Sequence, residues 1–338
     1  MAGAMAAWHD GADTENAARE SAQPGNLVTA FPDHAIEAEL TAVLVAVTDG
    51  EPRVLTIDEG RLLPSGPFVS AHRTLQASLR AWVEQQTHHP LGYVEQLYTF
   101  ADRDRSSEDA SRRVVSISYL GLTRQARASG RHHPAWRVWY RYFPWEDWRE
   151  GAPPMIAKLI VPRLRAWAAT AGEAAVRRAR QQRIRITFGL GDLPWNEEMV
   201  LQRYELLFEA GLVPEAIRRG GDLATALPGE AMLHDHRRIL ATGIARLRAK
   251  IKYRPVVFEL MPESFTLLQL QRTVEALAGQ ILHKQNFRRL VEQQALVEET
   301  GEVTTETGGR PAKLFRFRER VLQERAIAGT TLPISRMV

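Results

Sequence analysis

The sequence predicts an α+β protein built from a helix-covered sheet, a helical insertion and a smaller C-terminal module of helices and a hairpin. Three observations lead to this fold class. Strand-like apolar runs are concentrated between residues 40 and 122, helical periodicity dominates from about 155 to 251, and two amphipathic helices followed by a hairpin pattern begin near Thr266. A chain of 338 residues is long enough to form two cores.

Composition excludes several classes of protein. The chain has no cysteine, which rules out disulfide scaffolds, thiolate metal sites and cysteine nucleophiles. No uncharged apolar run approaches the roughly 20 residues that a membrane helix needs, and no basic N-terminal segment precedes an apolar core. We therefore expect a cytoplasmic protein that does not contact a membrane.

The sheet module begins after residues 1–26, which have almost no large aliphatic side chains and are expected to form a mobile tail. Residues 40–47 are a buried-strand run, Asp49-Gly50 is a turn signal, and 53–57 returns as a second strand, so a β-hairpin is expected. The further elements expected in this module are a helix over 73–86 and two strands over 94–100 and 114–122.

The middle of the chain changes character twice. Residues 136–149 are dense in aromatic side chains, which favours a core or dimer interface over a platform that stacks an adenine. A helical stretch over 155–216 follows, interrupted by an alternating, strand-like pattern at three apolar residues, Ile184, Ile186 and Phe188. A basic helix over about 234–251 then precedes the C-terminal module.

Arginine is used heavily, although the formal net charge is only +4. Five arginines fall between Arg177 and Arg185, and six further basic residues lie along the later helix, at Arg237, Arg238, Arg246, Arg248, Lys250 and Lys252. Such clusters can attract phosphate backbones. A solvated helix face is the alternative, and for any single cluster it is favoured.

The C-terminal module opens on a helix-start signal. Thr266 and Gln269 have the spacing of a capping box, apolar residues then recur at helical intervals, and Gly279 is placed to end the helix. A second helix over 283–294 can turn three apolar residues to the core, Phe287, Leu290 and Val291. The same packing exposes four polar or basic residues, Lys284, Gln285, Arg288 and Arg289. A hairpin pattern over about 296–317 follows.

Helix, short turn, basic helix and hairpin is the order of elements in a winged helix-turn-helix. In that geometry the second helix enters the major groove, where glutamine and arginine suit adenine and guanine edges. The wing residues Arg310 and Lys313 would reach phosphates or the minor groove. The alternative is a helical hairpin for dimer contacts, which the acidic wing residues favour somewhat: Glu298, Glu299, Glu302 and Glu306. We favour DNA binding.

A second motif lies between the first hairpin and the first helix. Residues 63–69 (Leu-Pro-Ser-Gly-Pro-Phe-Val), with Gly66 at the turn, resemble the entrance of the Nudix box. A Nudix hydrolase carries closely spaced glutamates on the following helix, and these hold the divalent metals that bridge a pyrophosphate. In this chain Trp82, Gln85 and Gln86 stand at those positions, and Glu84 lies at the variable one. Neutral glutamine cannot balance dications, so we expect this box not to catalyse hydrolysis.

The chain resembles the Nudix-related, NrtR-like transcriptional regulators of bacterial NAD metabolism. The segments that carry the resemblance are 93–105, 113–120, 258–271, 286–289 and 309–317. Residues 142–149 (Tyr-Phe-Pro-Trp-Glu-Asp-Trp-Arg) are most similar to the NadQ-type alphaproteobacterial branch. The resemblance implies a Nudix-type α/β/α sandwich with a helical insertion, plus a C-terminal winged helix-turn-helix. It also implies a homodimer that binds an operator in double-stranded DNA.

The resemblance further implies repression of genes for NAD synthesis or salvage, with an adenine nucleotide effector (ATP, NAD or ADP-ribose) and no required cofactor. Arg103, Arg105 and Arg113 lie on or beside the loop that borders the nucleotide cleft in Nudix folds, where they could grip phosphates. A solvated loop paired with its own acidic residues is an equal alternative. The histidine pairs at 88–89 and 132–133 lack a carboxylate at ligand spacing and are expected at the surface, so no metal site is assigned.

The leading hypothesis is a nucleotide-responsive, non-enzymatic DNA-binding repressor. The alternatives are a pyrophosphatase that acts on ADP-ribose-like substrates with carboxylates from outside the box, and a scaffold that binds a protein partner through the middle segment. The expected domains are a tail (1–26), a degenerate Nudix-like domain (27–150), a helical insertion (151–230), a basic linking helix that completes the Nudix-like domain (231–255) and a winged helix domain (256–330).

Overall fold

The computed structural model describes residues 36–69, 71–89, 91, 94–101, 113–126, 132–217, 226–253, 256–305 and 311–318. The expected tail (1–26) and three candidate contact residues, Arg103, Arg105 and Arg310, lie outside these ranges. None of the helices in the described segments is both long enough and apolar enough to cross a membrane.

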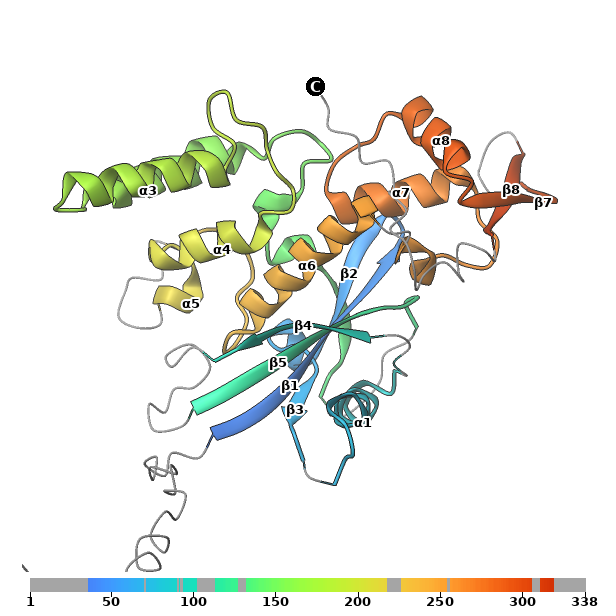
Figure 1. The fold of residues 1–338 in the computed structure, drawn as a ribbon, viewed down its shortest axis with the longest axis horizontal. Helices are drawn as coiled ribbons and strands as arrows, with labels where there is room; N and C mark the ends of the chain where they lie inside the picture. Colours follow the sequence, from blue (N-terminus) through green and yellow to red (C-terminus); the bar gives the residue numbers. More distant parts are fainter. Residues whose placement is uncertain are drawn as a thin grey trace, which may run out of the picture. The chain divides into compact units, whose positions relative to one another are not determined.

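A mixed sheet organises the described part of the first module (Figure 1). Its strands run in the order β4-β5-β1-β2-β6, and β3 pairs with the first half of β1. β1 and β5 are parallel, and the other neighbours are antiparallel. The strands are β1 (Ile36–Thr48), β2 (Glu51–Thr56), β3 (Ser65–Pro67), β4 (Val94–Phe100), β5 (Arg113–Leu122) and β6 (Ala135–Val138).

The predicted hairpin and both later strands are confirmed. Asp49 and Gly50 join β1 to β2 with φ angles of 55° and 74°, as a two-residue type I′ turn requires. The strands predicted over 94–100 and 114–122 are β4 and β5, whose pairing shifts register between Gln96 and Thr99.

Alternation along β1 sends its side chains to two separate cores. Leu40 and Leu44 pack in one cluster with Val83 of α1 (Leu75–Thr87). Val43 and Val45 belong to a second cluster that includes the apolar side chains of α6 (His236–Tyr253). Because α1 and α6 cover opposite faces of the sheet, the predicted three-layer α/β/α sandwich is confirmed.

The aromatic segment after β6 forms part of the larger core. Tyr140 is buried, and its hydroxyl donates to the carbonyl oxygen of Ala276 at 2.7 Å. Four further aromatic side chains of this segment are completely buried: Trp139, Tyr142, Phe143 and Trp145. The core interpretation of this segment is therefore confirmed, and a nucleotide-stacking role for these rings is wrong. This aromatic segment contains two short 3-10 helices, η2 (Trp139–Arg141) and η3 (Pro144–Glu146).

Three further short helical elements lie elsewhere in the chain. They are the 3-10 helices η1 (Asp58–Gly60) and η6 (Val256–Leu260) and the π-helix η4 (Ile156–Ile160).

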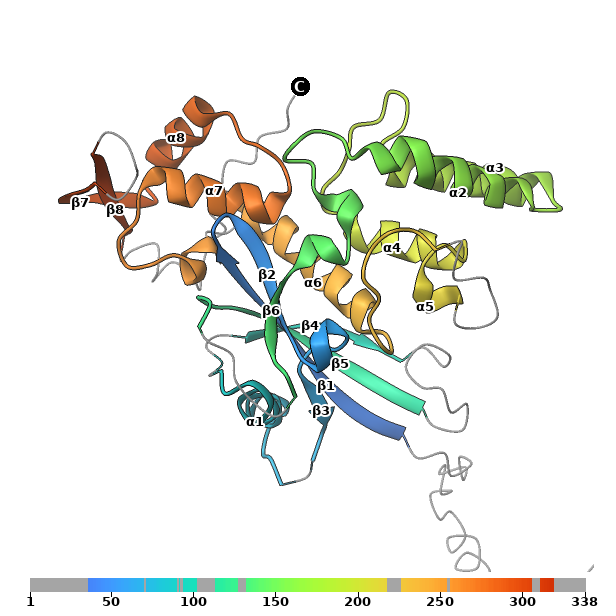
Figure 2. The ribbon, with the colours of Figure 1, turned by 180° about the vertical axis from the view of Figure 1, so that it is seen from behind.

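Helices α2 (Val161–Ala169), α3 (Ala174–Thr187), α4 (Val200–Glu209) and α5 (Pro214–Ile217) make up the described insertion (Figure 2). The predicted strand-like interruption is wrong, because α3 runs through Ile184 and Ile186 and has Phe188 as its C-cap. Ile184 and Phe188 are buried and one helical turn apart, whereas Ile186 between them is 44% exposed. A helix with one apolar residue at the surface therefore produced the alternating pattern.

The C-terminal module contains α7 (Leu267–Ala278), α8 (Lys284–Gln293) and the hairpin of β7 (Val297–Thr304) and β8 (Ala312–Phe317). The capping box at the start of α7 is confirmed: Thr266 Oγ1 accepts from the Gln269 amide, and Gln269 Oε1 accepts from the Thr266 amide. Gly279 ends α7 with a φ of 71°. Phe265 and Phe315 exchange two backbone hydrogen bonds that tie the hairpin to the start of α7. The predicted winged helix-turn-helix is confirmed.

Two basic residues of α6 are buried rather than solvated. Arg237 is 1% exposed and Arg248 is 0% exposed, so the favoured interpretation of a solvated helix face is wrong for both. Arg237 pairs with Glu215 at 3.1 Å, and Arg248 pairs with Glu146 at 2.9 Å. Both carboxylates come from distant segments and are themselves buried, so these cations balance charge inside the protein and are not available to a phosphate backbone.

Candidate nucleic-acid interface

The second helix of the C-terminal module presents the predicted polar face. Phe287 and Val291 are buried against the module, and Leu290 is half-buried. The four predicted contact residues all have exposed side chains: Lys284, Gln285, Arg288 and Arg289. The face that a recognition helix needs is therefore present, polar and free of the core.

The turn before α8 is held by two buried polar residues that the sequence analysis missed. Glu275 Oε1 accepts from the Leu282 amide at 2.9 Å and from Gln271 Nε2 at 2.8 Å. Gln271 Nε2 also donates to the Leu282 carbonyl oxygen at 3.0 Å. This arrangement fixes the angle at which α8 leaves α7. The i, i+4 spacing of Gln271 and Glu275 on α7 was the available signal.

The wing carries charge pairs across its two strands. Lys313, a predicted phosphate contact, donates to Glu299 at 2.8 Å, and Arg316 donates to Glu298 at 2.7 Å. Both lysine and arginine side chains remain more than 60% exposed, so they can exchange these partners for phosphates. The acidic wing residues therefore balance basic ones locally and do not by themselves exclude DNA.

In the segment that resembles a Nudix box, two side chains of α1 hold the entrance strand β3. Trp82 Nε1 donates to the Pro67 carbonyl oxygen at 2.8 Å. Gln86 makes two bonds to Ser65, accepting from its amide at 3.1 Å and donating to its carbonyl oxygen at 2.7 Å. Gln85 is exposed. Trp82 and Gln86 thus stabilise β3 against α1.

Gly66 allows the close approach of Trp82, and its replacement by alanine is expected to lower the free energy of unfolding by about 1–3 kcal/mol. A Cβ at position 66 would lie 2.3 Å from Trp82 Cδ2, closer than two carbon atoms can approach. Urea unfolding of Gly66→Ala, Trp82→Ala and the double variant measures the effect. We expect strong non-additivity, since Trp82→Ala removes the clash; additive losses would contradict the contact.

Of the three arginines expected to border a nucleotide cleft, only Arg113 has its backbone within the described residues. Arg103 and Arg105 lie outside the described residues. Arg113 begins β5 and pairs with Ile36 of β1, but its side chain is not among those that the structure describes. Glu39, on β1 beside β3, was not predicted as a site residue; burial raises its pKa, which a hydrogen bond with Ser65 partly offsets. Among the described residues no group of three or more His, Cys, Asp or Glu side chains is arranged to hold a metal ion.

Two histidines, His89 and His236, are buried, and one of them was expected at the surface. The expectation for His89 is wrong: it is 3% exposed, and its Nε2 lies 3.1 Å from Thr123 Oγ1. His236 Nδ1 accepts from the Leu63 amide at 2.8 Å, next to the entrance of the box. Both side chains therefore have structural partners.

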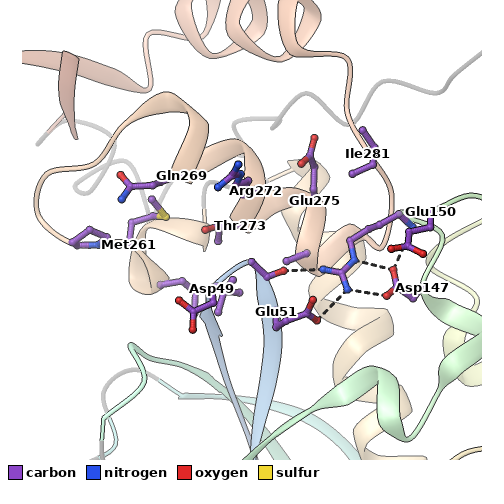
Figure 3. Close-up of a pocket in the computed structure, with 16 residues that line it drawn as sticks. Asp49, Glu51, Asp147, Glu150, Met261, Gln269, Arg272, Thr273, Glu275 and Ile281 are labelled. Carbon is purple, nitrogen blue, oxygen red and sulfur yellow. Dashed lines mark hydrogen bonds and ion pairs between the residues drawn. The ribbon is translucent and has the colours of Figure 1, made fainter. Parts of the chain in front are cut away.

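A pocket of about 830 Å³ lies between the β1–β2 turn and α7 (Figure 3). Arg149 forms part of its wall, donating to the Gly50 carbonyl oxygen at 2.8 Å, to Glu51 at 3.0 Å and to Asp147 at 2.8 Å. The hydrogen bonds that Arg149 donates to Asp147 and Glu51 raise its pKa above the ordinary value, although burial opposes them. Sequence reasoning missed this pocket because its walls come from three segments far apart in the chain.

Comparison with known proteins bears directly on the C-terminal module. Residues 257–317 match the family model of the NrtR DNA-binding winged helix domain. The segment is similar to the NrtR winged helix, and it is called the NrtR-type winged helix below. The ADPR responsive transcriptional repressor NtrR of Acinetobacter baylyi is 41% identical over 83 residues, which cover 25% of this chain and 33% of the relative. The alignment thus spans one third of that relative.

Solved structures resemble a larger part of the chain at lower identity. NrtR of Shewanella oneidensis, solved with a 27mer DNA, is 21% identical with a TM-score of 0.48, over 87% of this chain and 99% of that one. A MutT/nudix family protein from Enterococcus faecalis is 16% identical with a TM-score of 0.49, over 85% of this chain and 89% of that one. At these values neither structure establishes the function of this chain. The NrtR-type winged helix is the best supported functional module.

Proposed function

We propose that this protein is a DNA-binding transcriptional repressor of genes for NAD synthesis or salvage. The observation that carries the proposal is the polar face of α8, with Lys284, Gln285, Arg288 and Arg289 exposed on an NrtR-type winged helix. Arginine and glutamine form bidentate hydrogen bonds with guanine and adenine edges in the major groove. A homodimer would place two such helices on a two-fold symmetric operator.

The effector in this proposal is an adenine nucleotide, with ADP-ribose ahead of ATP and NAD. The name of the Acinetobacter baylyi relative, an ADPR responsive repressor, supports this order. The resemblance of residues 142–149 to NadQ-type regulators supports placing the chain in that branch. Thermal-shift measurements with ADP-ribose, ATP, NAD and NADH test the choice, because a ligand that binds only the folded state raises its apparent stability.

The same proposal gives the Nudix-like module a sensing role without hydrolysis. Trp82 and Gln86 are engaged in holding β3, and a neutral amide cannot replace a carboxylate in balancing a cluster of dications. Incubation with ADP-ribose and Mg²⁺ or Mn²⁺, followed by product chromatography, is expected to show no turnover. Robust hydrolysis would favour the alternative, a pyrophosphatase that uses carboxylates from outside the box.

A labelled-DNA gel shift tests the repressor function itself. The probes are the region upstream of the protein's own gene and promoters of NAD-synthesis genes, with a scrambled duplex of equal length as the control. We expect specific retardation of at least one promoter at moderate salt. No shift of any promoter would contradict the proposed function.

Arg288→Ala and Arg289→Ala are each expected to weaken promoter binding by about 1–3 kcal/mol where the arginine contacts a base. Both side chains are exposed, so thermal unfolding should be unchanged. Arg272→Ala, an exposed arginine on α7, is the matched control. If both α8 variants bind promoters as the wild type does, α8 is not the recognition helix.

A further inference from the structure

The positive charge of this chain is concentrated in the insertion rather than in the NrtR-type winged helix. We define the basic hairpin as residues 156–187, which comprise η4, α2 and α3. It contains one acidic residue, Glu173, against eight basic ones: Lys158, Arg163, Arg165, Arg177, Arg178, Arg180, Arg183 and Arg185. The segment 257–317, in contrast, has seven basic and eight acidic residues. Because the whole chain is only +4, everything outside the basic hairpin is net acidic.

Much of this charge has no acidic partner within the described part of the chain. Arg183 pairs with Glu209, and Arg185 pairs with Asp192. Three exposed cations have no recorded acidic partner among the described residues: Lys158, Arg165 and Arg178. Two more arginines donate to backbone carbonyl oxygens, which orients them without balancing their charge: Arg177 to Ala171, and Arg180 to Trp167.

The exposed surface of α3 favours a polyanion over a lipid bilayer. A helix that lies on a membrane needs a broad apolar face of large side chains. On α3, Ile184 is turned into the core, and the large exposed apolar side chains are Val176 and Ile186, separated by arginines. Such a surface can neutralise phosphates, but it cannot bury a continuous apolar stripe in acyl chains.

The basic hairpin is joined to the winged helix through a common anchor. Arg203 Nη1 donates to the carbonyl oxygen of Thr187, the last residue of α3, and Arg203 pairs with Glu146. Glu146 also pairs with Arg248, whose Nε donates to the carbonyl oxygen of Leu277 in α7. All three charged side chains are completely buried or nearly so. The end of α3 and the end of α7 are therefore fixed to the same cluster.

We propose that the basic hairpin is a second DNA-contacting surface, which binds the phosphate backbone of double-stranded DNA while α8 reads the bases. The inference rests on the proposed function and deepens it by assigning a role to the insertion. A winged helix with a near-neutral charge gains little non-specific attraction from its own residues. The basic hairpin would supply that attraction, and the buried cluster ties the end of α3 to the end of α7.

The test compares three variants with the wild-type protein on a long random-sequence duplex and on the promoter probes, over a range of KCl concentrations. The first carries Lys158→Gln, Arg165→Gln and Arg178→Gln. The second, its charge-retaining control, carries Arg165→Lys and Arg178→Lys. The third carries Arg288→Ala and Arg289→Ala. Fluorescence anisotropy gives the association constant at each salt concentration. The slope of log association constant against log salt concentration is proportional to the number of counterions released on binding.

Each phosphate contact contributes about 0.9 to that slope, so the triple glutamine variant should lose about two to three units and at least about tenfold in affinity at low salt. The lysine control should keep the wild-type slope. A wild-type slope in the glutamine variant overturns the inference. If, in that case, the variant with Arg288→Ala and Arg289→Ala still loses promoter binding, the proposed repressor function stands although the role of the basic hairpin is overturned.

Failure of the wild-type protein to bind any duplex would instead overturn both proposals. Sedimentation with phosphatidylserine-containing vesicles distinguishes the other polyanionic surface. The inference is overturned if the three glutamine substitutions abolish vesicle binding but leave the salt slope on DNA unchanged. The basic hairpin would then be a surface for anionic lipid.

Discussion

Replacing Glu146 by glutamine is expected to lower the free energy of unfolding by about 3–5 kcal/mol. Glu146 is 1% exposed and pairs with two guanidinium groups, those of Arg203 at 2.5 Å and Arg248 at 2.9 Å. All five N–H groups of Arg248 have acceptors inside the protein. Removing the carboxylate charge leaves two buried cations without the carboxylate that pairs with both of them, and neither can move to water without disrupting the core.

Urea unfolding measures this loss, and the same substitution in a surface pair is its control. Glu230 pairs with Arg141, and their side chains are 38% and 51% exposed. Glu230→Gln should therefore cost no more than about 1 kcal/mol. If Glu146→Gln costs equally little, the buried cluster does not depend on its carboxylate charge.

Glu146→Gln should also loosen the end of α7 in the C-terminal module. Arg248 and Tyr140 donate to the carbonyl oxygens of Leu277 and Ala276, in the last turn of α7. Helix ends leave such carbonyls without partners inside the helix. Hydrogen exchange in the turn between α7 and α8 should therefore accelerate in Glu146→Gln, while exchange in α1 on the opposite face of the sheet stays nearly unchanged.

Local signals explain why the C-terminal module could be predicted from the sequence. Thr266 and Gln269 are three residues apart, and Gly279 directly follows the last helical residue. The residues that predict the two ends of α7 are therefore the same residues that form its caps. The exposed face of α8 follows from the burial of Phe287 and Val291 at helical spacing. The hairpin turn at Asp49-Gly50 is local in the same sense.

Pairing between distant segments explains most of what the sequence did not predict. The partner of Arg248 is 102 residues away and that of Arg203 is 57 residues away. A run of arginines looks the same in a solvated face and in a buried cluster until such partners are known. The segment that resembles a Nudix box shows a related limit. The sequence shows that position 86 carries a glutamine, but it could not predict the two hydrogen bonds that Gln86 makes to Ser65.

Acidification is expected to destabilise the protein through His236. Burial lowers the pKa of this imidazole to about 3 from its ordinary value of 6.5. Its Nδ1 accepts from the Leu63 amide, so a second proton would set two donors against each other. In the unfolded chain the ring takes up a proton as the pH falls through 6.5, whereas in the folded chain it stays neutral down to about pH 3. The stabilisation that neutral His236 contributes is therefore fully present above pH 6.5 and is lost progressively as the pH falls towards 3.

The expected contribution is about 2 kcal/mol between pH 7 and pH 5, and it approaches about 4–5 kcal/mol near pH 3. His236→Asn isolates it, because an amide oxygen can accept from Leu63 but does not titrate in this range. The variant should lose about 2 kcal/mol less than the wild type between pH 7 and pH 5, in urea unfolding at each pH. His132→Asn, at an exposed histidine, should leave the wild-type dependence intact. Equal pH dependence in wild type and His236→Asn would mean that His236 is not the group responsible. Because His236 joins α6 to the box entrance at Leu63, its protonation should loosen that entrance before the sheet unfolds.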